Sequence, residues 1–226
     1  MLAAVTDLIT NTFIVFFVVI DPVGLAPMFG ALTQGSGRVY QRRMAMRGIF
    51  LAMGILLMFS LTGQFLFVAL GISLDAFRIA GGVLLFLLSI DMIFARQSGL
   101  RSTTSSEQSE AVQRQDISVF PLAIPLIAGP GAVTTVLLLM GEQSGNVQAQ
   151  SIILGILVVV LLITLLVLLF SDRIMRLIGE TGANVISRVL GVVLTNVAKR
   201  GANLRRSPLG AARRPDAGSR APSRRA

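Results

Sequence analysis

The sequence of 226 residues contains neither cysteine nor histidine. Without cysteine the chain has no disulfide framework and no thiolate site. Without histidine it lacks the commonest metal ligand and the commonest general base. It also lacks a Gly-x-Ser-x-Gly nucleophile motif, and few acidic residues lie within its apolar segments. These absences argue against an intramembrane enzyme. The sequence predicts no enzymatic activity and no bound cofactor.

Long stretches of the chain carry almost no charge. Hydrophobic residues make up 54% of the sequence, too many for an ordinary soluble domain. Four runs are each long enough for a helix that crosses an apolar layer about 30 Å thick: residues 48–74, 77–95, 117–141 and 145–171. An N-terminal segment at about residues 5–29 adds a fifth span, and residues 185–198 form a weaker sixth. Because the runs lack the alternation of barrel strands, the predicted fold class is all-α, a multi-pass membrane protein with six helices.

Surplus positive charge is concentrated in a C-terminal tail and one loop. Residues 1–198 hold 11 Arg against 10 acidic residues, whereas residues 199–226 hold nine basic residues against one acid. We predict a disordered tail that is either simply solvated or in contact with anionic lipid headgroups. A nucleic-acid partner has no aromatic or fold support. The loop at residues 33–47 carries four Arg and no acid, which is typical of the cytoplasmic side.

An acidic residue interrupts the first predicted span. Asp21 stands in an otherwise uncharged stretch and is followed by Pro22 and Pro27. A charged side chain inside a membrane costs about 2.5–3.5 kcal/mol on insertion scales, so such a residue indicates a functional site. The prolines predict a broken helix, in which Asp21 caps a second half that starts at Pro22. A simple kink with no further role is the alternative.

The second half of the chain repeats this order of features. A Gly/Pro interruption at residues 129–131 again falls inside an apolar run, and a plain span follows it. Arg78-x-x-Gly81 and Arg188-x-x-Gly191 then mark the third span of each half. With three spans per half, the two halves must be inverted relative to one another. Inverted repeats with paired broken helices recur in transporters, where the binding site lies near the midplane.

We therefore divide the chain into four parts. Residues 1–95 form a first three-helix repeat and residues 117–198 a second, each opening with a broken helix. Residues 96–116 form a polar cytoplasmic loop between them, and residues 199–226 form the basic tail. The apolar part of the last helix, residues 189–198, covers only ten residues, or about 15 Å of helix. We expect this sixth helix to be shortened.

The two interrupted segments resemble a known family. The motif Asp21-Pro22-Val23-Gly24-x-x-Pro27 and the motif Ile124-Pro125-Leu126-x-x-Gly129-Pro130-Gly131-Ala132-x-Thr134-Thr135 are similar to those of the MarC family of bacterial inner-membrane proteins. The resemblance covers about residues 1–194. It implies six helices in the bacterial inner membrane, with the N-terminus outside the cytoplasm. It also implies a relation to neutral amino acid transporters.

The chemistry of the paired breaks suits a zwitterionic solute. Helices that start at Pro22 and Pro130 would direct their positive dipole ends and free N–H groups at a carboxylate. Asp21 would act as a negative partner or take up a coupling H⁺. Unwound carbonyl groups around Ile20 and Ala128 would accept hydrogen bonds from an ammonium group or coordinate a coupling cation such as Na⁺. The glycines leave room for a small ligand, and the threonines supply hydroxyl groups. The predicted substrate-binding residues are Asp21, Pro22, Gly24, Pro27, Gly129, Pro130, Gly131, Thr134 and Thr135.

Other interpretations remain open on the sequence alone. The chain could be an efflux carrier or a channel for another small solute. A shift of reading frame near Leu194 would explain the short sixth helix and the tail, and would leave a membrane protein without transport activity. Six spans would place the basic tail opposite the Arg-rich loop, against the usual charge bias.

The expected partners are the lipid bilayer and a small-molecule solute, with no specific nucleic acid. A homo-oligomer is compatible with these features.

Overall fold

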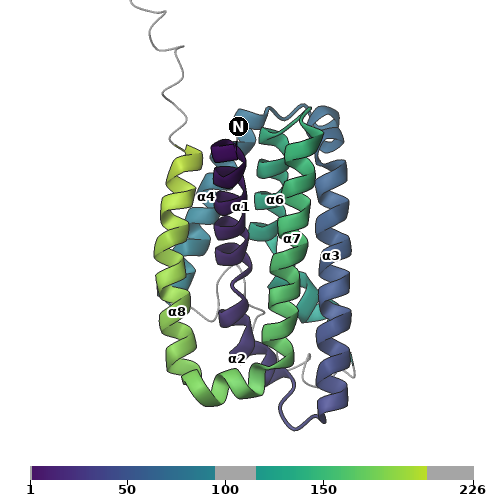
Figure 1. Ribbon diagram of the computed structural model, residues 1–226, viewed down its shortest axis with the longest axis vertical. Coiled ribbons are helices and arrows are strands. Elements are labelled where there is room, and N and C mark those ends of the chain that lie inside the picture. Colours follow the sequence, from purple (N-terminus) through teal and green to yellow (C-terminus); the bar gives the residue numbers. More distant parts are fainter. Residues whose placement is uncertain (1, 95–115, 203–226) are drawn as a thin grey trace, which may run out of the picture.

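The described part of the chain is helical throughout. The computed structural model describes residues 2–94 and 116–202, and it contains no strand within these ranges. The helices stand side by side in one upright bundle (Figure 1). Their bounds are α1 Leu2–Ile20, α2 Pro22–Leu32, α3 Arg38–Ala69, α4 Leu74–Ile93, η1 Ser118–Ile127, α6 Pro130–Glu142, α7 Val147–Leu169 and α8 Ser171–Ala202. The predicted polar loop and basic tail lie almost entirely outside the described residues.

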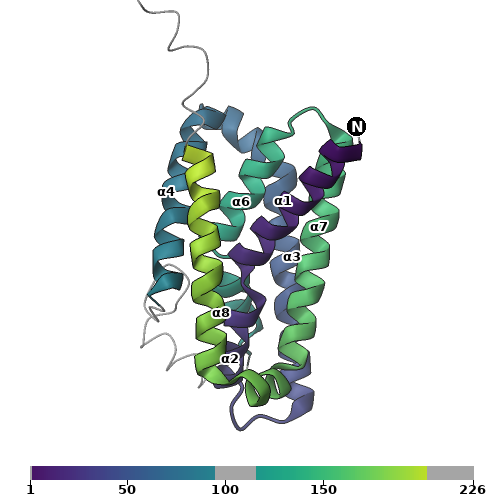
Figure 2. The same cartoon turned by 60° about the vertical axis from the view of Figure 1, so that its left-hand side comes forward.

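The number of helices that can cross a membrane agrees with the prediction. Within residues 2–94 and 116–202, five helices, α1 and α2 counting as one, are long and apolar enough to span a bilayer, and the bent pair of η1 and α6 raises the number to six if it forms one span. The chain passes from one end of the bundle to the other at each span (Figures 1 and 2). The N-terminus and the end of α8 therefore lie at the same end of the molecule, which we call the N-terminal end.

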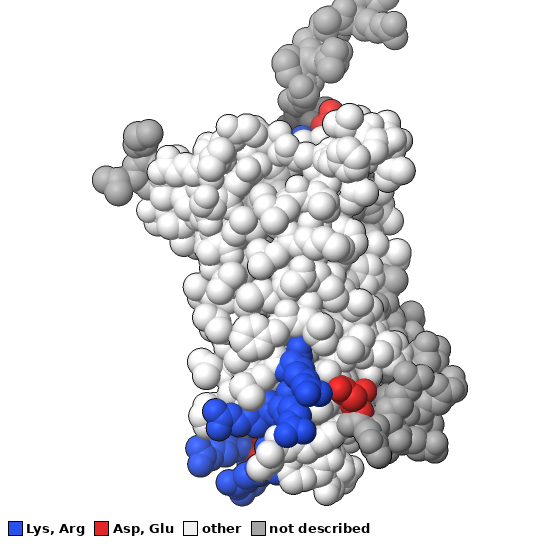
Figure 3. Space-filling view, turned by 90° about the vertical axis from the view of Figure 1, so that its right-hand side faces the viewer, with Lys and Arg blue, Asp and Glu red and all other residues white. Residues whose placement is uncertain are grey.

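Basic side chains gather at the opposite end (Figure 3). We call this the basic end, and it is formed by the start of α3 and the start of α8. Helix α3 begins about ten residues before the apolar run that predicts it, because its first turns carry exposed arginines beyond the apolar layer. The arginines in the first segments of these two helices are Arg38, Arg42, Arg43, Arg47, Arg173 and Arg176.

The last helix is longer than we predicted. Helix α8 bends at Gly179, whose φ of 69° is easily adopted only by glycine. Its first segment lies across the basic end, and its second segment runs the height of the bundle (Figure 2). Thr181–Lys199 alone spans 19 residues and is apolar enough to cross a membrane. The sixth helix is therefore not limited to the ten apolar residues that the sequence analysis counted.

Hydrogen bonds within α8 explain the difference. Asn196 Nδ2 donates to the Val192 carbonyl oxygen at 3.2 Å, which satisfies one of its amide hydrogens within the helix. Thr195 Oγ1 lies 3.1 Å from the Gly191 carbonyl oxygen and 3.0 Å from Ser89 Oγ on α4. Polar side chains that bond to the preceding turn fit into a membrane helix. A count of apolar residues alone underestimates the length of such a helix.

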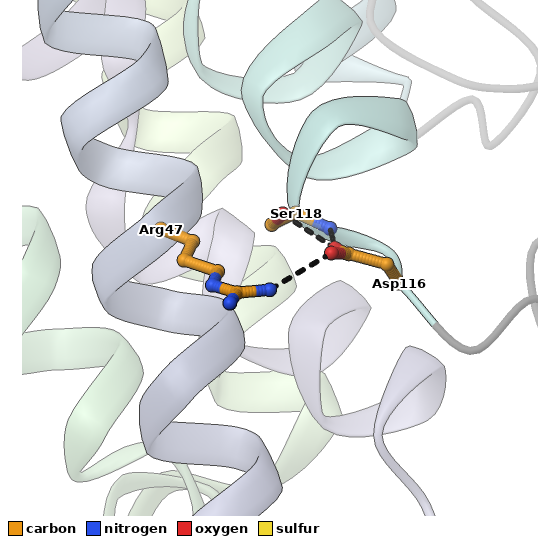
Figure 4. Close-up of polar contacts among 3 residues, drawn as sticks. All are labelled: Arg47, Asp116 and Ser118. Atoms are coloured by element: carbon orange, nitrogen blue, oxygen red, sulfur yellow. Dashed lines mark hydrogen bonds and ion pairs between the residues drawn. The ribbon is translucent and has the colours of Figure 1, made fainter.

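An ion pair links the two halves near the basic end. Arg47 Nη1 on α3 lies 3.1 Å from Asp116 Oδ2, just before η1 (Figure 4). The other carboxylate oxygen accepts hydrogen bonds from the hydroxyl and the backbone N–H of Ser118. The hydrogen bonds from Ser118, followed by the nearby Arg47, hold the pKa of Asp116 below its usual value. Because the pair is about half exposed, we assign it a role in positioning the start of η1 more than in stability.

Candidate functional site

The first break in the chain forms as the sequence predicts. Helix α2 starts with Pro22, and the Asp21 carboxylate caps it by accepting a hydrogen bond from the Gly24 N–H at 3.0 Å. The prediction of Asp21 as N-cap and Pro22 as first helical residue is confirmed. Asp21 is only 3% exposed and adopts the left-handed conformation, with φ 48° and ψ 68°. Aspartate is one of the few residues that tolerate this backbone conformation.

Gly24 is necessary for this cap geometry. A methyl group at Gly24 would collide with Asp21 Oδ2 and would lie 2.5 Å from Ser187 Oγ of α8. The carboxylate therefore folds over a position where only glycine fits. Ser187 is a site residue that sequence reasoning missed, because nothing in its local sequence indicates that α8 reaches the first break. Its hydroxyl oxygen is buried and has no hydrogen-bond partner within the described part of the chain.

The second break also falls where the sequence predicts. Helix α6 starts with Pro130 after the N-cap Gly129, and η1 and α6 are bent by 55°. Segment η1 is itself irregular, with extended backbone angles at Phe120 and Ile124. A methyl group at Gly129 would collide with the backbone oxygen of Pro125, so the turn requires glycine for steric reasons. Unlike α2, helix α6 has no side-chain cap.

The two breaks approach each other in the middle of the bundle. A methyl group at Gly131, in the first turn of α6, would lie 3.5 Å from Val19 Cγ1 and 2.7 Å from Leu88 Cδ2. Val19 comes two residues before Asp21, at the end of α1. From the breaks, α2 runs to the basic end and α6 runs to the N-terminal end (Figure 2). The N-termini of these two helices therefore both face the middle of the bundle.

Helix packing occupies the space beside the two glycines of the second break. The Pro125 backbone oxygen stands beside Gly129, and the Leu88 and Val19 side chains stand beside Gly131. In this conformation the glycines serve close packing, and the space that we expected them to leave for a ligand is filled by protein. Any ligand at this position would require the helices to part.

The remaining predicted site residues differ in their surroundings. Thr135 is buried, and its hydroxyl donates to the Gly131 carbonyl oxygen at 2.8 Å, so it lies at the second break. Thr134 is also buried, but its methyl group faces α4, where a methyl group at Gly81 would lie 2.7 Å from it. Pro27 is half-buried inside α2. The structure thus groups Thr135 with the breaks and directs the Thr134 methyl toward a neighbouring helix.

A second buried hydroxyl stands out on α1. Thr12 is 1% exposed, and its Oγ1 has no hydrogen-bond partner within the described residues. Thr12 and Ser187 are the two hydroxyl side chains with this property in the described part of the chain. A buried hydroxyl without a partner loses about 1–3 kcal/mol relative to water. Such groups are candidates for contact with a polar solute or with water.

Comparisons with known proteins identify the family. The family model described as "MarC family integral membrane protein" matches residues 6–200, beyond Leu194 and through the second segment of α8. The UPF0056 membrane protein YvbG of Bacillus subtilis is 35% identical over 190 residues, which cover 84% of this chain and 90% of the relative. The UPF0056 membrane protein MJ1677 of Methanocaldococcus jannaschii is 37% identical over 182 residues, covering 80% of this chain and 87% of the relative. No solved structure matches the chain significantly. The chain belongs to the MarC family of integral membrane proteins.

Proposed function

We propose that this protein is a carrier of small zwitterionic solutes, neutral amino acids first among them, in the bacterial inner membrane. The observation that carries the proposal is the convergence of two helix N-termini on the middle of a membrane-spanning bundle. One of them bears a buried carboxylate, Asp21, and the other has no side-chain cap. A zwitterion needs one anionic and one cationic partner, and this pair of helix ends offers both.

The asymmetry of the two caps assigns an orientation to the solute. In α6, the N–H groups of Gly131 and Ala132 have no partner within the helix, because the first turn of any helix leaves its donors free. The partial positive charge there attracts a carboxylate. In α2 the equivalent charge is already offset by Asp21. The solute carboxylate therefore binds at the start of α6, and its ammonium group faces Asp21.

The course of the helices supports an inverted repeat. The pair α1–α2 runs from the N-terminal end to the basic end, whereas the pair η1–α6 runs the opposite way (Figures 1 and 2). Helices α3 and α7 are likewise opposed, and so are α4 and the second segment of α8. Opposed repeats with a central site are the usual basis of alternating access. The filled space beside Gly131 fits a closed state, which opens when the two halves move relative to one another.

Counterflow in proteoliposomes tests the proposal. Purified protein is reconstituted with unlabelled alanine inside, and uptake of labelled glycine or alanine is measured at several concentrations. We expect saturable exchange that Asp21→Asn abolishes and that the matched variant Asp7→Asn leaves intact, because Asp7 is exposed near the start of α1. Repeating the measurement with imposed H⁺ and Na⁺ gradients identifies the coupling ion.

The outcomes of this experiment separate the alternatives. Non-saturable flux would indicate a channel, and exchange of other solutes but not of amino acids would indicate a different carrier. Unchanged exchange in Asp21→Asn would remove the carboxylate from the mechanism. Absence of all exchange by correctly inserted protein would contradict the proposed function for this chain.

We also propose that the protein forms a homo-oligomer through α8. Asn184, Arg188 and Asn196 are spaced by multiples of four residues, so they share one face of the helix, and all three are exposed in the single chain. Polar groups on a membrane helix rarely face lipid. A second copy of the chain would cover them.

Light scattering in detergent should report more than one copy of the chain per particle. Arg188→Leu combined with Asn196→Leu should change the number of copies per particle. A strictly monomeric particle would contradict this arrangement.

A further inference from the structure

A pocket opens at the basic end, away from the two helix breaks. Its volume is about 450 Å³, and it lies between the first turns of α3, the end of α7 and the start of α8. Four of its lining residues are arginines and one is an acid. The arginines are Arg38, Arg42, Arg173 and Arg176, and the acid is Asp172. The pocket therefore carries a marked excess of positive charge.

The positive charge of the pocket exceeds the negative charge that the described residues place there. None of the four arginines takes part in the ion pairs found among the described residues. Arg176 Nε donates to the Asp172 carbonyl oxygen at 3.1 Å, and the Arg173 guanidinium stands 5.6 Å from the centre of the Phe170 ring. These contacts orient the side chains without placing them in an ion pair with any described residue.

The N-terminus of α3 lies at the pocket and adds to the positive electrostatic potential there. The helix starts at Arg38, and its N-cap Gly37 offers no side-chain acceptor. The N-terminus of a helix carries a partial positive charge, so arginines in the first turns are electrostatically unfavourable unless an anion is bound nearby. Two of the pocket arginines, Arg38 and Arg42, lie in this position. The local sequence thus places cations where a bound anion would relieve their repulsion.

Apart from Gln41, the remaining lining residues of the pocket are apolar. Leu168, Leu169 and Phe170, at the end of α7, line it beside the arginines. The first segment of α8 lies across the bundle end and exposes 86% of Leu177, as expected for a helix at the level of the lipid headgroups. An arginine cluster beside an apolar wall at this level suits a phosphate that is attached to acyl chains.

We propose that this pocket binds the phosphate group of an anionic lipid headgroup. Guanidinium groups bind phosphate through paired N–H donors. Basic pockets between helices on one side of a membrane are suitable sites for such headgroups. A free phosphate anion presents the same chemistry to the arginines, so the test must distinguish these two sources. The site does not involve Asp21 or the helix breaks, and it does not depend on the proposed transport activity.

Native mass spectrometry of the purified full chain measures the binding. Phosphatidylglycerol, phosphatidylcholine and inorganic phosphate are titrated separately against the unaltered protein. The same titrations are made with Arg42→Gln combined with Arg173→Gln, which removes two charges from the pocket. The matched control combines Arg43→Gln with Arg47→Gln, which removes two charges at the same end from residues that do not line the pocket. Circular dichroism checks that every variant keeps its helical content.

We expect phosphatidylglycerol to bind more tightly than phosphatidylcholine. The pocket variant should weaken phosphatidylglycerol binding by at least about tenfold, while the control changes it by less than about threefold. Arg42→Lys with Arg173→Lys keeps the charge but loses the paired N–H donors, so its affinity should lie between those of the unaltered chain and the Gln variant. If the unaltered chain binds inorganic phosphate but neither lipid, the site belongs to a free anion and the lipid proposal is wrong. Equal binding of the two lipids, or equal losses in the pocket variant and the control, would overturn the proposal.

Discussion

Substitutions of Asp21 distinguish its structural role, as the cap of α2, from the role of its negative charge in transport. Asparagine keeps a side-chain oxygen that accepts the hydrogen bond from the Gly24 N–H, and it also tolerates the left-handed conformation seen at this position. We therefore expect Asp21→Asn to lower the free energy of unfolding by less than about 1 kcal/mol. The same variant should abolish transport, because it removes the charge that faces the solute.

Alanine at the same position should affect the fold itself. The loss of the cap costs about 1 kcal/mol. Alanine adopts a φ of 48° less readily than aspartate does, which adds up to about 1 kcal/mol. Together these effects predict a destabilisation of about 1–2 kcal/mol for Asp21→Ala. Asp21→Gly loses the cap but suits the backbone, so its stability should lie between those of the Asn and Ala variants.

The amino-acid composition limits the methods by which unfolding of these variants can be measured. With no tryptophan, one tyrosine and no cysteine, intrinsic fluorescence and thiol-reactive dyes report little. Loss of helical circular dichroism, as sodium dodecyl sulfate is titrated into dodecylmaltoside micelles, measures unfolding directly. Equal stability of the Asn and Ala variants would refute the role of the cap. A glycine variant no more stable than alanine would refute the contribution of the backbone conformation.

Two further predictions concern the second break and the topology. Gly129→Ala should destabilise the protein by about 1–3 kcal/mol, because its methyl group meets the Pro125 backbone oxygen, whereas Gly155→Ala, with open space around it, should be nearly neutral in the same titration. Since the chain has no cysteine of its own, single cysteines at Gln34 and Ser144 can be labelled from one side of the membrane with an impermeant maleimide. Only one of the two should react, and reaction of both in intact cells would contradict the topology.

Much of the membrane architecture could be predicted from the sequence. Uncharged runs must be buried in lipid or protein, so their lengths predict the spans and their number. The cap at Asp21 was also predictable, because Pro22 disfavours a helical conformation at the residue before it and aspartate favours the cap position. The requirement for Gly129 is local too, since the atom it must avoid belongs to Pro125, four residues earlier.

Only the tertiary structure determined which distant residues meet at the site. Ser187 reaches Gly24, and Val19 reaches Gly131, through helix packing that no local pattern specifies. Thr195 Oγ1 lies within hydrogen-bond distance of the Gly191 carbonyl oxygen in its own helix and of Ser89 Oγ on α4, and hydropathy does not describe such contacts.

The basic pocket likewise exists only because two distant helix starts lie side by side. In the sequence, the arginines of α3 and those of α8 are separate surface charges, each with an ordinary role in topology. In the folded chain they line one pocket. Local sequence determines where a helix begins, which residues cap it and whether it enters the membrane. The packing of helices far apart in the chain determines which of those beginnings share a site, because that depends on the complementary shapes of whole helix faces.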